Sequence, residues 1–325
     1  MTEKTFLEAI RDSMAEEMRK DPNVILIGED IGVYGGAFTV TKGMLDEFGP
    51  DRIINTPMSE AAIVGCAIGT SMTGMRPIVE IMFMDFMTLT MDQLTNHAAK
   101  FSYIYGGGVK VPIIIRTPAG AGRGYGASHS QSLESWFMHI PGMKVVIPST
   151  PYDAKGLMKS CLKTSSPVLF IENKLLYSKK GEVPDNYYEV PIGKADVKRK
   201  GSDITIITYG RMVDMALEQA AEASAAGIDI EVIDLRSILP FDRETIIEST
   251  KKTGKVIIIE EDTKTGGVGA EISASICESA FEFLRAPIRR IACEDIPIPY
   301  CKNLETAALP SKGKIMDEVL YLIDR

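Results

Sequence analysis

The first twenty residues carry the pattern of an amphipathic helix. Thr5 and Glu8 stand three positions apart, the spacing at which a threonine and a glutamate cap a helix start reciprocally. Phe6, Ile10 and Met14 then recur every four residues, which places them on one helical face. The pattern therefore predicts a helix that packs onto the rest of the fold through this face.

The chain then alternates between two kinds of segment. Short apolar runs, typical of buried parallel strands, are separated by longer stretches with helical periodicity. Alternation of this kind predicts right-handed crossovers and a parallel sheet covered on both faces, which we assign to a first domain, residues 1–175. The strand-like runs are 24–27, 52–55, 77–83, 111–116, 144–147 and 168–171, and the helix-like stretches are 60–72, 85–101, 132–139 and 151–163.

A polar stretch rich in lysine, glycine and proline interrupts the alternation at residues 176–201, and we interpret it as a linker. A second alternating set follows, so residues 202–325 form a second domain. The predicted class is α/β, with two domains that each hold a mainly parallel sheet flanked by helices. The expected strands are 204–208, 229–234, 255–260 and 288–292, and the expected helices are 212–226, 243–252, 269–284 and 314–323.

Composition narrows the class of protein without changing this architecture. The chain has 325 residues, of which 45% are hydrophobic, and a net charge of −8. Nonspecific nucleic-acid binding needs a basic surface, so the acidic balance argues against it. Five cysteines without a CxxC pair, beside only three histidines, argue against a zinc site. No apolar run reaches the roughly 20 residues that cross a bilayer, so we expect a cytoplasmic protein without membrane contact.

Candidate chemistry lies where the strands of the first domain end, because open α/β sheets bind ligands at the carboxyl ends of their strands. Glu29 follows the first strand, and Glu60 follows the second at the start of a helix. Phe86 follows the third, and His129 lies in a glycine-rich loop, residues 117–131, after the fourth. We expect these carboxylates, the ring and the imidazole to share one edge.

Each of these residues also has a simpler interpretation. Ser59 is placed as a helix N-cap, so Glu60 could serve only the helix dipole. Phe86 could be a core residue, and His129 could be a packing or hydrogen-bonding histidine. The motifs GxxxxGK[ST], GxSxG and HExxH are absent, and no GxGxxG follows a strand, which argues against several nucleotide-binding and hydrolase classes.

Several collinear segments together indicate a family. Over nearly its whole length the chain resembles the beta subunit of the thiamine-diphosphate-dependent component of 2-oxo acid dehydrogenase complexes, and it looks most like acetoin dehydrogenase beta subunits. The segments that carry the resemblance are Gly28-Glu29-Asp30, Arg52 to Glu60, Gly74 to Ile78, His129 to Ser132, Tyr152 to Leu157 and Gly266 to Ile272, and the acetoin subtype rests on Arg116 to Gly122, Gly181 to Pro184, Tyr187-Tyr188 and Pro191 to Asp196.

The resemblance implies roles for the candidate residues. The first domain would bind the aminopyrimidine half of thiamine diphosphate, and the second would resemble the C-terminal domain of transketolases. Glu60 would hydrogen-bond N1′ of the pyrimidine, with Glu29 supporting it. His129 would face the thiazolium side and assist transfer of the acyl group to lipoamide. Phe86 would lie against the pyrimidine ring, and Met58 and Met82 would line the same pocket.

The resemblance also bears on Leu89 and on a set of backbone carbonyls. Some relatives place a polar residue one turn past Phe86, where this chain has Leu89, so Leu89 is doubtful as a ligand. Some relatives also hold a potassium ion through backbone carbonyls. In this chain the corresponding residues are Ile113, Cys161, Leu162, Thr164 and Ser166.

The resemblance also explains an absence. The diphosphate of the cofactor is normally held through Mg²⁺ by a Gly-Asp-Gly motif, and no Gly-Asp pair occurs in this chain. An alpha subunit would supply that half of the site in an α2β2 heterotetramer, which would dock on a lipoyl-bearing acyltransferase core. The substrate would be acetoin, pyruvate or a branched-chain 2-oxo acid. The competing hypotheses are a transketolase-like enzyme with another acceptor and an α/β binding module without activity.

Overall fold

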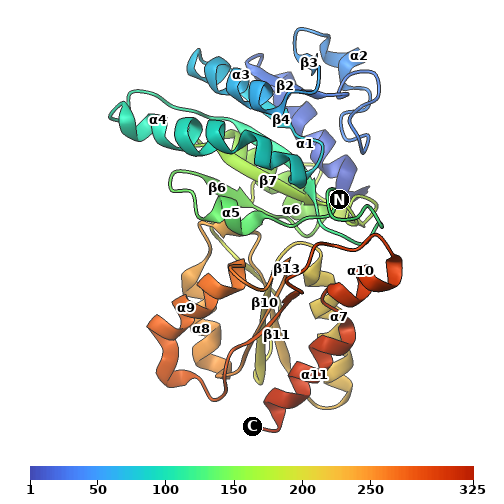
Figure 1. The fold of residues 1–325 in the computed structure, drawn as a ribbon, viewed down its shortest axis with the longest axis vertical. Helices are drawn as coiled ribbons and strands as arrows, with labels where there is room; N and C mark the ends of the chain where they lie inside the picture. Colours follow the sequence, from blue (N-terminus) through green and yellow to red (C-terminus); the bar gives the residue numbers. More distant parts are fainter. The chain divides into compact units, whose positions relative to one another are not determined.

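The computed structural model describes all residues from Met1 to Arg325 (Figure 1). The chain divides into two compact units. The first comprises Met1–Ala119 and Trp136–Ile192, and the second comprises Gly120–Ser135 and Gly193–Arg325. The glycine-rich loop that carries His129 thus groups with the second unit, although it follows a strand of the first.

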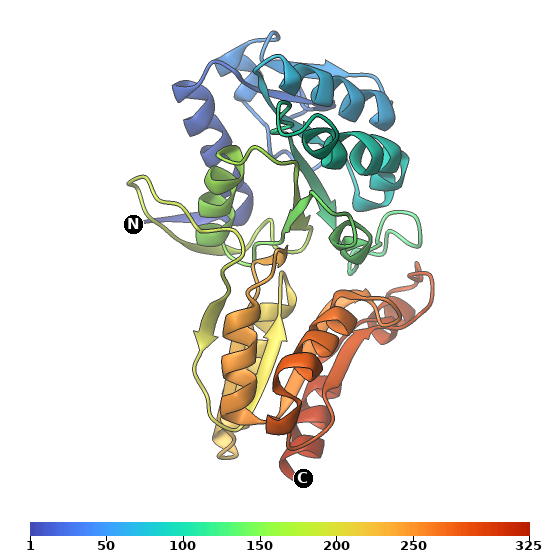
Figure 2. The same ribbon diagram turned by 90° about the vertical axis from the view of Figure 1, so that its left-hand side faces the viewer.

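The first unit is built on a parallel sheet whose strands lie in the order β6-β7-β5-β4-β2-β3. The helices cover both faces of this sheet (Figure 2). The strands are β2 (Val24–Glu29), β3 (Ile53–Thr56), β4 (Arg76–Glu80), β5 (Ile114–Ala119), β6 (Lys144–Val146) and β7 (Val168–Asn173), and the helices are α1 (Phe6–Lys20), α2 (Met44–Phe48), α3 (Glu60–Met72), α4 (Ala99–Ile104), α5 (Glu134–Met138), within which the chain returns to this unit, and α6 (Pro151–Leu162).

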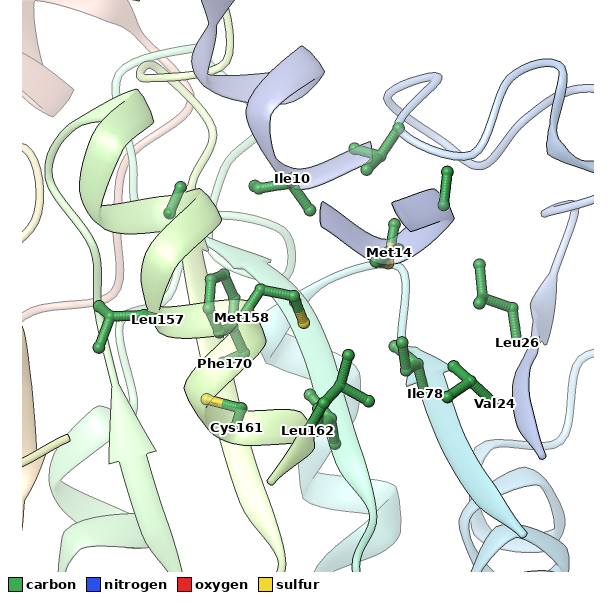
Figure 3. Packing of buried hydrophobic residues seen from close by; sticks show 14 of the residues in the cluster. Ile10, Met14, Val24, Leu26, Ile78, Leu157, Met158, Cys161, Leu162 and Phe170 are labelled. Carbon is green, nitrogen blue, oxygen red and sulfur yellow. The ribbon is translucent and has the colours of Figure 1, made fainter. Parts of the chain in front are cut away.

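The apolar face of α1 is the one that the sequence predicts. Ile10 and Met14 are buried against α6 and against alternate residues of the strands, such as Leu26 and Phe170 (Figure 3). Because side chains alternate across a strand, the neighbouring residues of β2 face the opposite side of the sheet. The capping box at Thr5 forms as predicted, with the Glu8 N–H donating to the threonine hydroxyl.

One predicted helix, residues 85–101, is wrong in detail. The chain forms a 3₁₀ helix, η1 (Met84–Thr90), then a π-helical stretch, η2 (Gln93–Ala98), before α4. The side chains of Met84, Met87 and Thr90 are buried at a spacing of three. Three residues per turn is the period of a 3₁₀ helix, so burial of this row fits the tighter winding.

The stretch interpreted as a linker contains two strands. β8 (Lys180–Val183) pairs antiparallel with β1 (Thr2–Thr5), so this part of the stretch is tied to the start of the chain. β9 (Asp196–Arg199) pairs antiparallel with a strand of the second unit. Polar composition concealed both, because neither strand is fully buried.

The second unit has the sheet order β14-β13-β10-β11-β9, in which only the edge strand β9 is antiparallel. The α/β class with two mainly parallel sheets is therefore confirmed. No helix of the protein is both long and apolar enough to span a bilayer. The elements are β10 (Ile204–Thr208), α7 (Met212–Ala225), β11 (Ile230–Asp234), β12 (Ser237–Leu239), α8 (Arg243–Thr253), β13 (Val256–Thr263), α9 (Val268–Ala280), η3 (Phe281–Phe283), β14 (Arg289–Cys293), α10 (Lys302–Ala308) and α11 (Lys312–Ile323).

Candidate active site

Two glutamates meet at the carboxyl ends of β2 and β3. These strands pair in parallel with Glu29 opposite Thr56, and α3 begins four residues later at Glu60. The backbone N–H of Ser59 lowers the pKa of the neighbouring Glu29 carboxyl, against the effects of its burial and of the Glu60 charge. The short connection between β3 and α3 therefore places the Glu60 charge beside Glu29, as the strand-end argument predicts.

The Glu29 carboxyl has unused hydrogen-bonding capacity. The residue is only 5% exposed, and its Oε1 is buried without a hydrogen-bond partner in the chain. Burial raises the pKa of Glu29, and the neighbouring Glu60 charge raises it further. A buried oxygen of this kind costs free energy unless it finds a donor, so it fits a ligand that presents an N–H group.

The start of α3 is consistent with both interpretations of Glu60. Ser59 is the N-cap residue, but its side chain makes no capping hydrogen bond. Glu60 lies in the first turn, so it interacts favourably with the helix dipole whatever else it does. Its side chain is half-buried, so Glu60 is not simply an exposed surface residue.

The aromatic candidate lies at the end of β4, the neighbour of β2 on its other side. Phe86 is half-buried in η1, and its ring lies edge-on to Phe83 with 6.0 Å between centroids. Met82 is half-buried nearby in the chain, whereas Met58 is 83% exposed. The first unit therefore brings Glu29, Glu60 and Phe86 to one edge of its sheet, with Met58 projecting into solvent.

Leu89 and His129 lie in different surroundings. Leu89 is 56% exposed in η1. His129 belongs to the second unit and is half-buried, with its Nδ1 3.0 Å from the Ser128 hydroxyl oxygen. Its backbone N–H donates to the Gly126 carbonyl across a turn.

The carbonyls proposed for potassium already accept hydrogen bonds. The guanidinium of Arg76 donates to Leu162 and Thr164, the latter at 3.2 Å. The remaining carbonyls accept from the backbone or from a hydroxyl, with Ile113 accepting from the Val168 N–H, and Cys161 and Ser166 from Thr164. The Arg76 guanidinium thus already supplies positive charge at these carbonyl oxygens, so the residues of the wild-type protein do not fit a potassium ion.

A buried ion network lies within the same sheet. The Arg116 guanidinium of β5 donates to Glu80 of β4 at 2.7 Å and to both carboxylate oxygens of Glu172 of β7 at 2.7 and 2.9 Å. The Tyr177 hydroxyl donates to Glu172 at 2.8 Å. The guanidinium of Arg116 donates these hydrogen bonds to charged side chains of the two neighbouring strands, which gives the residue a structural role in the sheet.

Comparison with known proteins matches both units to described domain families. Residues 2–180 match "Transketolase, pyrimidine binding domain", and residues 193–315 match "Transketolase, C-terminal domain". The pyruvate dehydrogenase E1 component subunit beta of Rhizobium meliloti (strain 1021) is 46% identical over 320 residues, covering 98% of this chain and 70% of the relative. The chain belongs to the E1 beta-subunit family of pyruvate and acetoin dehydrogenases.

Other relatives of this family carry a different substrate in their names. The acetoin:2,6-dichlorophenolindophenol oxidoreductase subunit beta of Bacillus subtilis (strain 168) is 44% identical over 328 residues, covering 97% of this chain and 96% of the relative. Among solved structures, an inactive beta4 tetramer of a split-gene transketolase matches with a TM-score of 0.79 at 23% identity, covering 98% of both chains. That likeness shows a shared transketolase-like fold and nothing finer.

The sequence pattern missed the acidic residues of the second unit that hold the glycine-rich loop. Glu261 and Glu305 accept hydrogen bonds from backbone N–H groups at the start of this loop. The glycines alternate from Gly120 to Gly126, and each has a positive φ. Alternating glycines of this kind turn backbone N–H groups towards one side, which could have indicated a need for an anionic partner.

Proposed function

We propose that this chain is the beta subunit of a thiamine-diphosphate-dependent acetoin dehydrogenase, active only together with an alpha subunit. The observation that carries the proposal is the Glu29–Glu60 pair, with one buried Glu29 oxygen lacking a donor. The E1 beta-subunit family supports the general class of enzyme. The proposed assembly is an α2β2 heterotetramer that docks on a lipoyl-bearing acyltransferase core.

The first unit would hold the pyrimidine half of the cofactor. Glu60 would hold a proton at N1′ of the ring, and Glu29 would accept a hydrogen bond at the ring edge. Phe86 would lie against the ring, with Met82 and Met58 beside it. The bound cofactor would supply the carbon nucleophile, which no side chain of this protein offers.

The second unit would contribute His129 to acyl transfer. An imidazole can donate a proton or stabilise charge at a reacting oxygen. The alpha subunit would hold the diphosphate through Mg²⁺, because this chain has no Gly-Asp pair for that purpose.

Acetoin as substrate rests on the segments between Gly181 and Asp196 and between Arg116 and Gly122. In that reaction acetoin would split into acetaldehyde and an acetyl group, and the lipoamide disulfide would act as oxidant and accept the acetyl group. Pyruvate and branched-chain 2-oxo acids are the second candidates. The relative that is 46% identical is named as a pyruvate dehydrogenase subunit, which favours pyruvate. The acetoin relative is 44% identical, so sequence identity alone does not decide between the two substrates.

The first test asks whether this chain holds only half of the cofactor site. The purified chain should bind thiamine diphosphate weakly, and activity should appear only after co-expression with an alpha partner that carries Gly-Asp-Gly. The reconstituted complex is then assayed with acetoin, pyruvate and 3-methyl-2-oxobutanoate side by side. Full activity from the isolated chain would overturn the half-site proposal, and a preference for pyruvate would overturn the choice of acetoin.

The role of Glu60 is tested by Glu60→Gln, which keeps the size of the side chain and removes its acidic proton. In the reconstituted complex this variant should assemble but lose exchange of the cofactor C2 proton, which is followed by NMR. Glu182→Gln, at an exposed position of β8, is the matched control and should keep normal exchange. Normal exchange in Glu60→Gln would remove Glu60 from the chemistry.

A further inference from the structure

The loop that carries His129 is held by acidic side chains of its own unit. Gly120–Ser135 leaves the first unit after β5 and groups with the second. The loop closes on itself through the Gly120 N–H, which donates to the Gln131 carbonyl. What fixes this closed loop in place determines where His129 lies.

Glu305 of α10 makes the central contact. Its carboxylate accepts the Gly122 N–H at 2.7 Å and the Gly124 N–H at 3.1 Å. The residue is only 2% exposed, so both hydrogen bonds lie away from bulk water. Charged acceptors make the stronger hydrogen bonds, and one carboxylate here binds two loop amides.

The glycines make this contact possible. Gly122 and Gly124 have φ values of 99° and 69°, in the left-handed region that other residues adopt only with strain. Successive turns of this kind direct N–H groups into one concavity, the type of site that binds anions. In this protein the anion is the side chain of Glu305.

The end of β13 holds the loop on either side of this contact. Glu261 accepts the Ala121 N–H at 2.7 Å, and Asp262 accepts the Ser135 N–H at 3.2 Å. Ala121 also packs in an apolar cluster of the second unit. Both ends of the loop are therefore fixed by one strand, and Glu305 fixes its glycine-rich part.

We propose that Glu305 is a positioning residue that fixes the Gly120–Ser135 loop and thereby places His129 for acyl transfer. The first half of this statement concerns the loop alone, and the second half rests on the proposed function. Glu305 would have no contact of its own with the reacting groups. It acts through the backbone of Gly122 and Gly124.

The structural half is tested by amide hydrogen exchange on the full-length chain. In Glu305→Ala, peptides covering residues 120–131 should exchange at least about tenfold faster, because a lost amide contact opens the loop locally. Glu305→Gln keeps an acceptor oxygen and should lie between Glu305→Ala and wild type. The control is Glu282→Ala, an exposed residue of η3, which should leave the loop unchanged. Unchanged loop exchange in Glu305→Ala would overturn the proposal.

The functional half is tested in the reconstituted complex with two readouts. Reduction of an artificial dye acceptor reports the steps before acyl transfer, and acetylation of lipoamide reports the transfer itself. Glu305→Ala should lower kcat for acetylation by about tenfold or more with little change in KM, while dye reduction stays near wild type. A general loss of both readouts would indicate a merely structural role and would overturn the positioning claim.

A double variant separates this proposal from the proposed function. If Glu305 acts through His129, adding Glu305→Ala to His129→Ala should cause no further loss of acetylation. A further loss would overturn the link between the two residues. If His129→Ala alone leaves acetylation unchanged while loop exchange in Glu305→Ala is faster, the role of His129 fails, and the loop contact of Glu305 stands.

Discussion

Arg116→Met would remove the guanidinium that lies between two buried carboxylates, Glu80 and Glu172. In the folded protein, Arg116 is 1% exposed and makes its hydrogen bonds to these residues at 2.7 to 2.9 Å. Methionine fills similar space but leaves both carboxylates without their cation. Breaking a buried ion pair on one side costs about 3–5 kcal/mol, so we expect the free energy of unfolding of the first unit to fall by that amount.

The assay uses the position of the tryptophan. Trp136 is the single tryptophan of the chain and belongs to the first unit, so its fluorescence in a urea titration reports on that unit. Arg19→Met is the matched control. Arg19 pairs with Glu47 at 2.5 Å on the surface, where such pairs contribute about 0–1 kcal/mol.

The stability loss in Arg116→Met should depend on pH. Burial raises the pKa of Glu80 above its usual 4.5 in the folded protein, and Arg116 opposes this rise. When the pKa of a carboxyl is higher in the folded than in the unfolded protein, the folded protein loses stability as the pH rises from the unfolded to the folded pKa. The loss in Arg116→Met should therefore be smaller at pH 5 than at pH 8. A loss equal to that of Arg19→Met, or one that does not change with pH, would refute the account of this network.

Three further predictions concern other sites. Glu29→Gln should be more stable than wild type at pH 8, with the difference closing towards pH 4, because burial and Glu60 raise the pKa of Glu29; thermal melts with no such difference would contradict this. Replacing potassium by sodium should leave the melting midpoint of the wild-type protein unchanged, because the Arg76 guanidinium already binds the carbonyl oxygens. Arg76→Met should melt at a lower temperature in sodium and regain stability in potassium. Equal midpoints of the variant in both salts would show that removing the guanidinium does not create a cation site. Thr5→Ala should cost about 1 kcal/mol in a urea titration through loss of the capping box, and no cost would mean that the start of α1 is held by other contacts.

The sequence predicts regular elements well where burial is periodic and local. The apolar face of α1 and the runs that became β2 and β7 are recognisable because each is buried along its whole length or on one face. The pairing of β1 with β8 was missed, since it depends on residues far apart in the chain. No local pattern in residues 2–5 indicates that partner.

The candidate site divides in the same way. The strand-end rule predicted that Glu29 and Glu60 lie close together, because their positions follow from two neighbouring parallel strands. The sequence did not reveal that Arg76 binds the carbonyl oxygens proposed for potassium, because Leu162 and Thr164 lie 86 and 88 residues away in the chain. Side chains that act over such separations are placed by the folded structure, and spacing in the sequence does not reveal them.

The contacts of the His129 loop also have a consequence for synthesis of the chain. Its amide partners, Glu261 and Glu305, lie 140 and 183 residues further along the sequence. During translation the strands of the first unit can pair long before the ribosome has made α10. The loop therefore receives its last anchor near the end of synthesis, so nascent or prematurely terminated chains would carry an ordered first sheet with this histidine still unplaced.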